Sequence, residues 1–237
     1  MMRYAPIRSA FYLLTLVGLA SCQWGVPNNK TKPAITVDTL VYTYKTIKER
    51  ASDCGNKPDS SCTVAKITYP IFVNQNALND SVTSKLTKAW YNDKVDNTVD
   101  EQAKSFIKFY ENDAAGKADH PDAPYSLESN AAVIRQDLSL LTIQIDRYAF
   151  TGGAHGSDYT GFINWNTKDN KAIELSDILK NGYRDKLTPI GEKIFRSQEK
   201  LSDTSSLAGY LFAGGKFSLN DNFLVTPIGI RFLYNEY

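Results

Sequence analysis

The sequence predicts an α+β fold in which mostly antiparallel sheets carry three long helices packed against them. Several segments alternate apolar and polar residues with the period of two that half-buried strands show. Three other segments repeat apolar residues at the spacing of amphipathic helices. Aromatic residues make up 12% of the chain, with 14 tyrosines and 11 phenylalanines, and these residue types favour strands.

Length and composition set the size of the fold and limit its partners. A chain of 237 residues can form one sizeable domain or two small, closely packed ones. Its hydrophobic content of 42% is typical of a packed core rather than of a disordered chain. The net charge is +1, without a basic stripe, so we expect no nucleic acid as the main partner.

Residues 1–21 have the features of a bacterial lipoprotein signal peptide. Two arginines precede the apolar run Ala10–Ala20, which is too short to span a bilayer as a mature helix. The run ends in Leu19–Cys22, a pattern in which the cysteine becomes the acylated first residue. An ordinary secretory signal with an incidental cysteine is the alternative.

Cys22 is therefore the predicted lipidation site, carrying acyl chains such as palmitate, and residues 22–35 are the predicted tether. Diacylation would anchor the protein durably, because one chain alone binds membranes only marginally. Gln23 gives no acidic retention signal, which favours the outer membrane, with the protein facing the periplasm.

The first two strands are predicted at Thr36–Lys48 and Thr63–Val73. One face of the first strand carries Leu40, Tyr42 and Tyr44, and one face of the second carries Ala65, Ile67, Tyr69 and Ile71.

Cys54 and Cys62 bracket the polar loop between these strands. With Cys22 acylated, they are the two remaining thiols of an exported protein, so we predict a disulfide. Metal binding is the weaker alternative, because His120 is far along the chain.

Two helices are predicted next, over Asn76–Asn92 and Asp96–Ala115. Their apolar stripes are Leu78, Val82, Leu86 and Trp90 in the first and Val99, Ala103, Phe106 and Tyr110 in the second. We interpret both stripes as core. Glycine and two prolines then end the second helix in a loop around His120. Its acids, Asp113, Asp119 and Asp122, are either simply solvated or face a basic partner.

Three strands are predicted at Tyr125–Ile134, Asp137–Phe150 and Asp158–Asn166. The second is the most regular, with Leu141, Ile143 and Ile145 on one face and Thr142, Gln144 and Asp146 on the other.

After a turn, the last third of the chain is predicted to begin with a short helix that has Ser176 as its N-cap. A third long helix follows over Tyr183–Leu201, with its apolar stripe at Leu187, Ile190, Ile194 and Leu201. Strands are predicted at Phe217–Leu219 and Phe223–Tyr234, the latter interrupted by Pro227 and Gly229.

The loop Gly152-Gly153-Ala154-His155-Gly156 is the most distinctive feature of the chain. Glycines permit positive φ or a close approach of backbone or ligand, so the loop is expected to follow an unusual path between two strands. His155 is then either presented at a site and oriented by Asp146 or Asp158, or it bonds a nearby carbonyl and only fixes a hairpin. The glycine spacing does not match a dinucleotide-binding fingerprint.

The order of this loop, the downstream Ile173–Leu179 and the terminal Asn222–Tyr234 resembles a known envelope module. That module occurs in the extracellular part of the lysozyme-sensing anti-sigma factor RsiV and in the non-catalytic part of the peptidoglycan deacetylase PdaC. It consists of two domains of unknown function, families 4163 and 3298. The first part is similar to Val64–Trp90, and the second to Leu138–Tyr237.

The resemblance implies that residues 36–237 form one α+β envelope module. Its N-terminal part would cover about 36–116 and its C-terminal part about 125–237. Family members usually have a further segment that returns into the sheet, so we expect a closing element to be missing after Tyr237.

The resemblance also implies a binding role without catalysis. We expect no cofactor, and no metal, because two histidines cannot supply a three-histidine zinc site and no His-Glu-x-x-His motif occurs. Our first hypothesis is a lipid-anchored envelope protein that binds a lysozyme-like protein or peptidoglycan. The candidate binding residues are Tyr148, Gly152, Gly153, His155, Asp158 and Tyr159. One alternative is an envelope carbohydrate hydrolase or deacetylase that uses His155 with Asp146 or Asp158. Another is a structural lipoprotein without a small ligand.

Overall fold

A six-stranded sheet is the central element of the structure, a computed structural model that describes residues 40–88, 95–115, 123–137 and 139–235. The predicted signal peptide, tether and Cys22 lie outside these residues, as do Trp90 and His120. No helix among the described residues is long and apolar enough to cross a bilayer. The prediction of an α+β fold with three long helices is confirmed.

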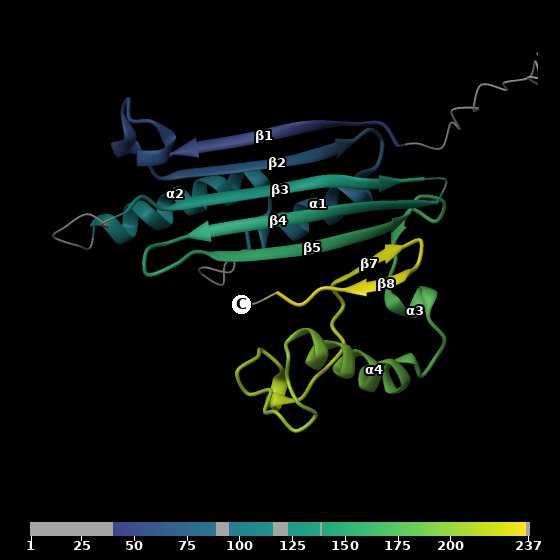
Figure 1. Cartoon of the computed structure of the whole chain (residues 1–237). Coiled ribbons are helices and arrows are strands. Elements are labelled where there is room, and N and C mark those ends of the chain that lie inside the picture. Colours follow the sequence, from purple (N-terminus) through teal and green to yellow (C-terminus); the bar gives the residue numbers. More distant parts are fainter. Residues whose placement is uncertain (1–39, 89–94, 116–122, 138, 236–237) are drawn as a thin grey trace, which may run out of the picture. The chain divides into compact units, whose positions relative to one another are not determined.

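The sheet combines antiparallel hairpins with one parallel pair (Figure 1). Its strands, in spatial order, are β1 (Tyr42–Arg50), β2 (Val64–Phe72), β3 (Ser126–Gln136), β4 (Leu140–Phe150), β5 (Ser157–Asn166) and β6 (Lys171–Ala172). Neighbouring strands pair antiparallel except β2 and β3, which are parallel. Parallel pairing needs a crossover connection. Two helices between β2 and β3 provide it.

Helices α1 (Asn76–Thr87) and α2 (Val99–Ala115) cover one face of the sheet (Figure 1). The described residues of both predicted stripes are buried: Leu78, Val82 and Leu86 in α1, and Val99, Ala103, Phe106 and Tyr110 in α2. The buried Arg147 of β4 donates to the carbonyl oxygens of Lys85 and Lys88, at 3.1 Å and 2.6 Å. It therefore satisfies carbonyl groups that the end of α1 leaves without a helical partner.

The side-chain alternation of the central strands matches the prediction. Leu141, Ile143 and Ile145 are at most 1% exposed and belong to the core between sheet and helices. In β2, the prediction fails at Ile71, which is 38% exposed, whereas Phe72 is buried. The Cys54–Cys62 disulfide is present and joins the two ends of the connection between β1 and β2.

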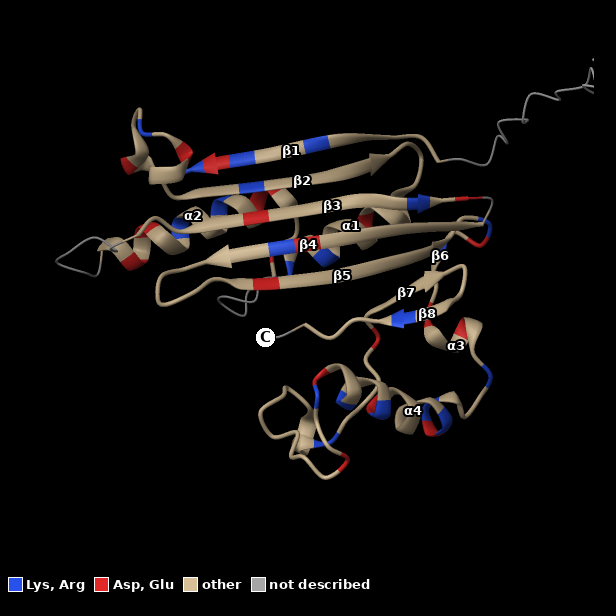
Figure 2. Ribbon diagram, in the orientation of Figure 1, with Lys and Arg blue, Asp and Glu red and all other residues tan. Residues whose placement is uncertain are grey.

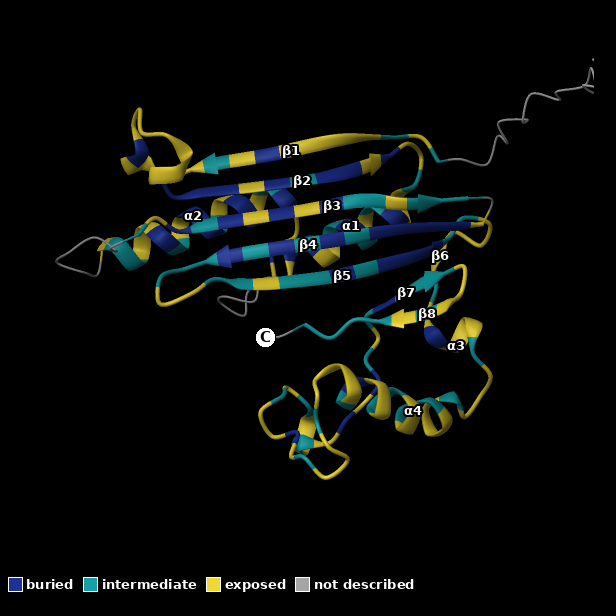
Figure 3. Cartoon of the chain, in the orientation of Figure 1, coloured by how far each residue is buried: buried dark blue, intermediate teal, exposed yellow. Residues whose placement is uncertain are grey.

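The C-terminal third adds two helices and a second, two-stranded sheet. Its elements are α3 (Leu175–Ile178), α4 (Tyr183–Gln198), β7 (Phe223–Thr226) and β8 (Gly229–Phe232). The hairpin of β7 and β8 confirms the predicted interruption at Pro227. This region has its own small core of Phe195, Leu207, Phe217 and Leu219. Figure 3 shows that most of the surrounding chain is exposed or half-buried.

Two local predictions in this region are wrong. Glu174, not Ser176, caps α3, because Glu174 and Asp177 form a reciprocal capping box that places Ser176 inside the helix. Residues 217–219 are not a strand. Phe217 and Leu219 are buried and Ser218 is exposed, so the alternation is present, but it serves packing in the small core without strand pairing.

The apolar stripe predicted for α4 is correct at Leu187 and Leu201, which pack against the small core, and wrong at the two isoleucines between them. Ile190 and Ile194 are each 54% exposed, whereas the buried residue is Phe195. The inward face passes through Gly191, where an added Cβ would lie 3.1–3.2 Å from side-chain atoms of Leu219 and Phe217. Because glycine has no side chain, the pattern of apolar residues does not reveal this face. The helix ends at Gln198, before Leu201.

Candidate functional site

The glycine loop connects β4 to β5 and follows the strained path that its composition predicts. Gly152 and Gly153 have φ of 89° and 94°, a region that L-residues with side chains rarely adopt. A Cβ on Gly152 would lie 3.3 Å from the ring of Tyr125. The hydroxyl of Tyr125 donates to Asp113, and burial followed by this bond raises the pKa of Tyr125 to about 12. The loop is thus packed onto the end of α2.

Gly156 permits a second close contact. A Cβ on this residue would overlap the ring of Tyr148, which therefore lies directly against the Gly156 backbone. His155, next to it, is exposed, and its Nδ1 is 3.0 Å from the carbonyl oxygen of Gly156. The nearby carbonyl expected for a hairpin histidine is thus the one that His155 contacts.

The pleat of β5 separates the predicted binding residues. Asp158 lies directly opposite Tyr148 in the β4–β5 register. Tyr159 lies opposite Arg147 and points to the helix-covered face, since successive strand residues alternate. Burial raises the pKa of Tyr159, and the nearby positive charge of Arg147 opposes this shift. Tyr148 and Asp158 therefore share the open face of the sheet, and the ring of Tyr159 does not join them.

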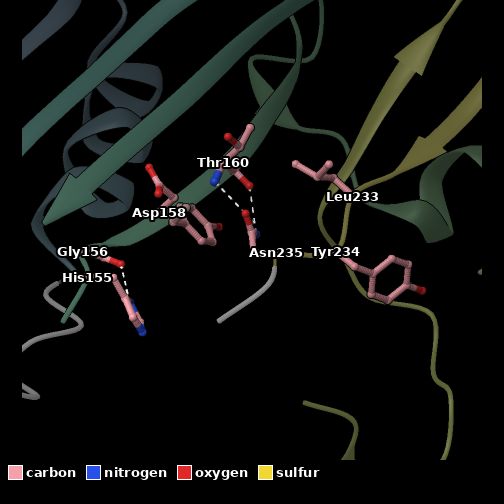
Figure 4. A pocket seen from close by; sticks show the side chains of 8 residues that line it. His155, Gly156, Asp158, Thr160, Leu233, Tyr234 and Asn235 are labelled. Atoms are coloured by element: carbon pink, nitrogen blue, oxygen red, sulfur yellow. Dashed lines mark hydrogen bonds between the residues drawn. The ribbon is translucent and has the colours of Figure 1, made fainter. Parts of the chain in front are cut away.

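A pocket of about 400 Å³ lies at the outer edge of β5 (Figure 4). It is lined by His155, Gly156, Asp158, Tyr159, Thr160, Leu233, Tyr234 and Asn235. Three of the six predicted binding residues thus line it. Of the others, Tyr148 packs against Gly156, and Gly152 and Gly153 shape the loop behind it.

Asparagine side chains occupy part of the β5 edge. Asn235 accepts a hydrogen bond from the Thr160 amide at 2.7 Å and donates to the Thr160 carbonyl at 3.1 Å (Figure 4). Asn222 accepts from the Phe162 amide at 3.1 Å and also donates to the Thr160 carbonyl at 2.8 Å. These amide groups take the place of a paired strand and hold the C-terminal segment against β5.

The residues that sequence reasoning missed are Asn222 and the segment Leu233–Asn235. They are about 60 to 75 positions away from β5, and the bonds that they form are with backbone groups. A side-chain pattern cannot report a backbone partner at such a distance. The available signal was that one asparagine flanks each end of the predicted terminal strand, Asn222 before it and Asn235 after it.

The hydrolase alternative needs the carboxylate of Asp146 or Asp158 beside His155. The carboxylate of Asp146 accepts from Gln144 at 2.9 Å and from the Thr160 hydroxyl at 2.7 Å. Asp158 is exposed, and Figure 4 shows its carboxylate pointing away from the ring of His155. Within the described parts of the chain, no three His, Cys, Asp or Glu residues are grouped so that they could hold a metal ion.

Two protein families match the chain, in consecutive segments. The first, described as Deacetylase PdaC, matches residues 56–158, and the second, described as Protein of unknown function (DUF3298), matches residues 176–237. The first match includes the glycine loop, so the second part does not begin at Leu138, as the family resemblance suggested. No curated protein is significantly similar to the chain.

Two solved structures share the fold. A DUF3298 family protein from Pseudomonas aeruginosa PAO1 superposes with a TM-score of 0.60 at 20% identity, covering 81% of this chain and 80% of that one. A DUF3298 family member from Bacteroides fragilis NCTC 9343 gives a TM-score of 0.55 at 20% identity, covering 81% and 82%. The chain therefore carries the PdaC/DUF3298 module, with the PdaC part first and the DUF3298 part second.

Proposed function

We propose that the chain is a non-enzymatic binding module of the bacterial cell envelope, held at the outer membrane by a lipid on Cys22 and facing the periplasm. Its ligand is cell-wall glycan, bound in the pocket between the glycine loop and Leu233–Asn235. The observation that carries this proposal is the composition of that pocket. Exposed His155 and Asp158 line it together with Tyr159 and the Asn235 amide.

The pocket offers what a sugar requires. Its volume of about 400 Å³ lies within the usual range for small-ligand sites. Aromatic carbon can cover the apolar face of a sugar ring, while carboxylate, imidazole and amide groups can bond hydroxyl and N-acetyl groups. The β5 edge adds backbone N–H and C=O groups, which fix ligand orientation in many sites.

The proposal is tested by titrating soluble peptidoglycan fragments into the purified protein and following the heat of binding. We expect saturable binding that His155→Ala and Asp158→Ala each weaken by about tenfold, equivalent to about 1.4 kcal/mol. The melting temperature should stay unchanged, because both side chains are exposed. Asp203→Ala is the matched control, since Asp203 is an exposed acid that does not line the pocket.

Other outcomes assign other functions. His155-sensitive binding of a c-type lysozyme, without glycan binding, would make the partner a lysozyme-like protein. Acetate or reducing sugar released from peptidoglycan, and lost in His155→Ala, would favour the deacetylase or hydrolase alternative. A folded protein that binds neither partner would leave the structural lipoprotein.

A further inference from the structure

A groove of about 1030 Å³ lies in the C-terminal region, between α4, the residues that follow it and the β7–β8 hairpin. Six aromatic rings line it: Phe195, Tyr210, Phe212, Phe217, Phe232 and Tyr234. The ring centroids of four of them, Phe195, Phe212, Phe217 and Tyr234, are 5.2–5.7 Å apart. They form one compact aromatic cluster, since each of the four rings packs against the other three.

Large aliphatic side chains are exposed along the same groove. Ile194 is 54% exposed, Leu211 is 77% exposed and Ile228 is 99% exposed, and all three line the groove. Single exposed aliphatic residues are common, but several gathered around one groove indicate a binding surface. Of the four clustered rings, Phe195 and Phe217 are buried, and Phe212 and Tyr234 are half-buried where they line the groove.

Three polar side chains that line the groove already form hydrogen bonds within the protein. The Tyr210 hydroxyl donates to Glu199 at 3.1 Å, and the Tyr234 hydroxyl donates to the Ser218 carbonyl at 3.0 Å. Asn220 donates to the Leu233 carbonyl at 2.6 Å. These three groups therefore already have partners within the protein.

The charged residues of the groove indicate which charged group its ligand carries. Two of the described residues that line the groove are charged, Glu199 and Arg231. Glu199 is occupied by Tyr210, whereas Arg231 on β8 is exposed and has no ion pair among the described residues. A guanidinium in a fixed fork geometry is well suited to a carboxylate or phosphate.

We propose that this groove binds a single-chain anionic amphiphile, with its acyl chain over the exposed Ile194, Leu211 and Ile228 and its carboxylate or phosphate on Arg231. The groove volume is close to the upper limit for small-ligand sites, which suits a long chain rather than a compact molecule. The site shares the segment Leu233–Asn235 with the pocket of His155 but does not depend on glycan binding there.

The test uses dodecanoate, below its micelle concentration, titrated into the detergent-free purified protein and followed by calorimetry. We expect saturable binding. Shorter chains such as decanoate should bind more weakly, by up to roughly fourfold for each methylene removed, because each buried methylene contributes about 0.8 kcal/mol of transfer free energy. Dodecyl maltoside, with the same chain and no charge, should bind at least about tenfold more weakly. Dodecyl phosphate should bind like dodecanoate and would show that Arg231 accepts either anion.

Variants assign the binding to the groove. Leu211→Asp and Ile228→Asp should each weaken dodecanoate binding by about tenfold or more, whereas Val41→Asp, at a residue 68% exposed and outside the groove, should not. Arg231→Gln should remove the preference for dodecanoate over dodecyl maltoside. His155→Ala should leave dodecanoate binding unchanged, which separates this site from the proposed glycan pocket.

The proposal is overturned if dodecanoate does not bind to folded protein, or if its affinity is the same in Leu211→Asp and the wild-type chain. It is also overturned if affinity is independent of chain length. A concentration-dependent dimer that Leu211→Asp abolishes, without any dodecanoate binding, would assign the groove to a second copy of the chain instead.

Discussion

Individual glycines and the rings that cover them determine the shape of the loop at the candidate pocket. Gly152 lies beneath Tyr125, and Gly156 lies beneath Tyr148, so two tyrosines occupy the space that side chains would need. These contacts hold His155 at the rim of the pocket, where its Nδ1 lies 3.0 Å from the carbonyl oxygen of Gly156 (Figure 4). The sequence predicted that glycine was required here, but not which rings required it.

Gly156→Ala should lower the free energy of unfolding by about 1–3 kcal/mol, because the new methyl group would displace the Tyr148 ring. Urea unfolding measures the change. Gly209→Ala is the matched control: no atom lies within 4 Å of a Cβ there, so its effect should stay within about 0.5 kcal/mol. Equal free energies of unfolding for the two variants would contradict the close contact between Gly156 and the Tyr148 ring.

Tyr125 should make stability depend on alkaline pH. Its folded-state pKa of about 12 exceeds the ordinary value of 10.0, so its contribution is complete below pH 10 and is lost as pH rises toward 12. The expected loss is about 1–3 kcal/mol. Urea unfolding across this range measures it, and Tyr125→Phe should flatten that part of the profile. A profile identical in the two proteins would show that Tyr125 ionises as easily when folded.

Among the secondary-structure elements, β1 and β2 are joined by an unusual connection, two short 3-10 turns closed by the Cys54–Cys62 disulfide. Both sulfurs are buried beside the end of α2, where Tyr110 donates to Asp53 at 2.8 Å. The disulfide therefore stabilises a loop that also forms part of the contact between sheet and helix.

The paired substitution of Cys54 and Cys62 by serine should lower the free energy of unfolding by about 2–3 kcal/mol, as expected for closing an eight-residue separation. Thermal unfolding with and without a reductant measures this effect. The reductant should lower the melting temperature of the wild-type chain and leave that of the double variant unchanged. A wild-type melting temperature insensitive to complete reduction would contradict the prediction.

Across the whole described chain, two cores of very different size support the fold. The core between the six-stranded sheet and helices α1 and α2 is extensive (Figure 3), whereas the small core of the C-terminal region consists of four buried apolar residues. Positive and negative side chains are interspersed over both regions (Figure 2). The small core is joined to β5 by the amides of Asn222 and Asn235. We infer that the C-terminal region opens more easily than the sheet.

Hydrogen exchange should reveal this difference. Amides of α4 are expected to exchange through local opening, at a lower free energy than amides of β4, because few buried contacts hold them. Phe195→Ala should increase exchange in α4 and leave β4 unchanged. Phe106→Ala, in the large core, should instead lower the global free energy of unfolding by about 3–5 kcal/mol. Equal protection of the α4 and β4 amides from exchange would contradict the inference that the C-terminal region opens more easily.

The regular elements of the first two thirds of the chain could be predicted because their burial is periodic. The apolar stripes of α1 and α2 and the alternation of β4 each mark one face that packs against the same large core. Prediction failed where this periodic pattern of apolar residues is interrupted. Gly191 leaves no apolar signal on the inward face of α4, and Phe217 and Leu219 alternate without pairing.

Local chemistry in the sequence was sufficient to establish the fold class, the Cys54–Cys62 pairing and the glycine-dependent loop, because each depends on neighbours in the chain. The parallel pairing of β2 with β3, the division of Asp158 and Tyr159 between two faces, and the Asn222 and Asn235 bonds to β5 required the tertiary structure. These features join segments that are distant in sequence, often through backbone groups common to every residue. No pattern of side chains along the chain encodes such partners.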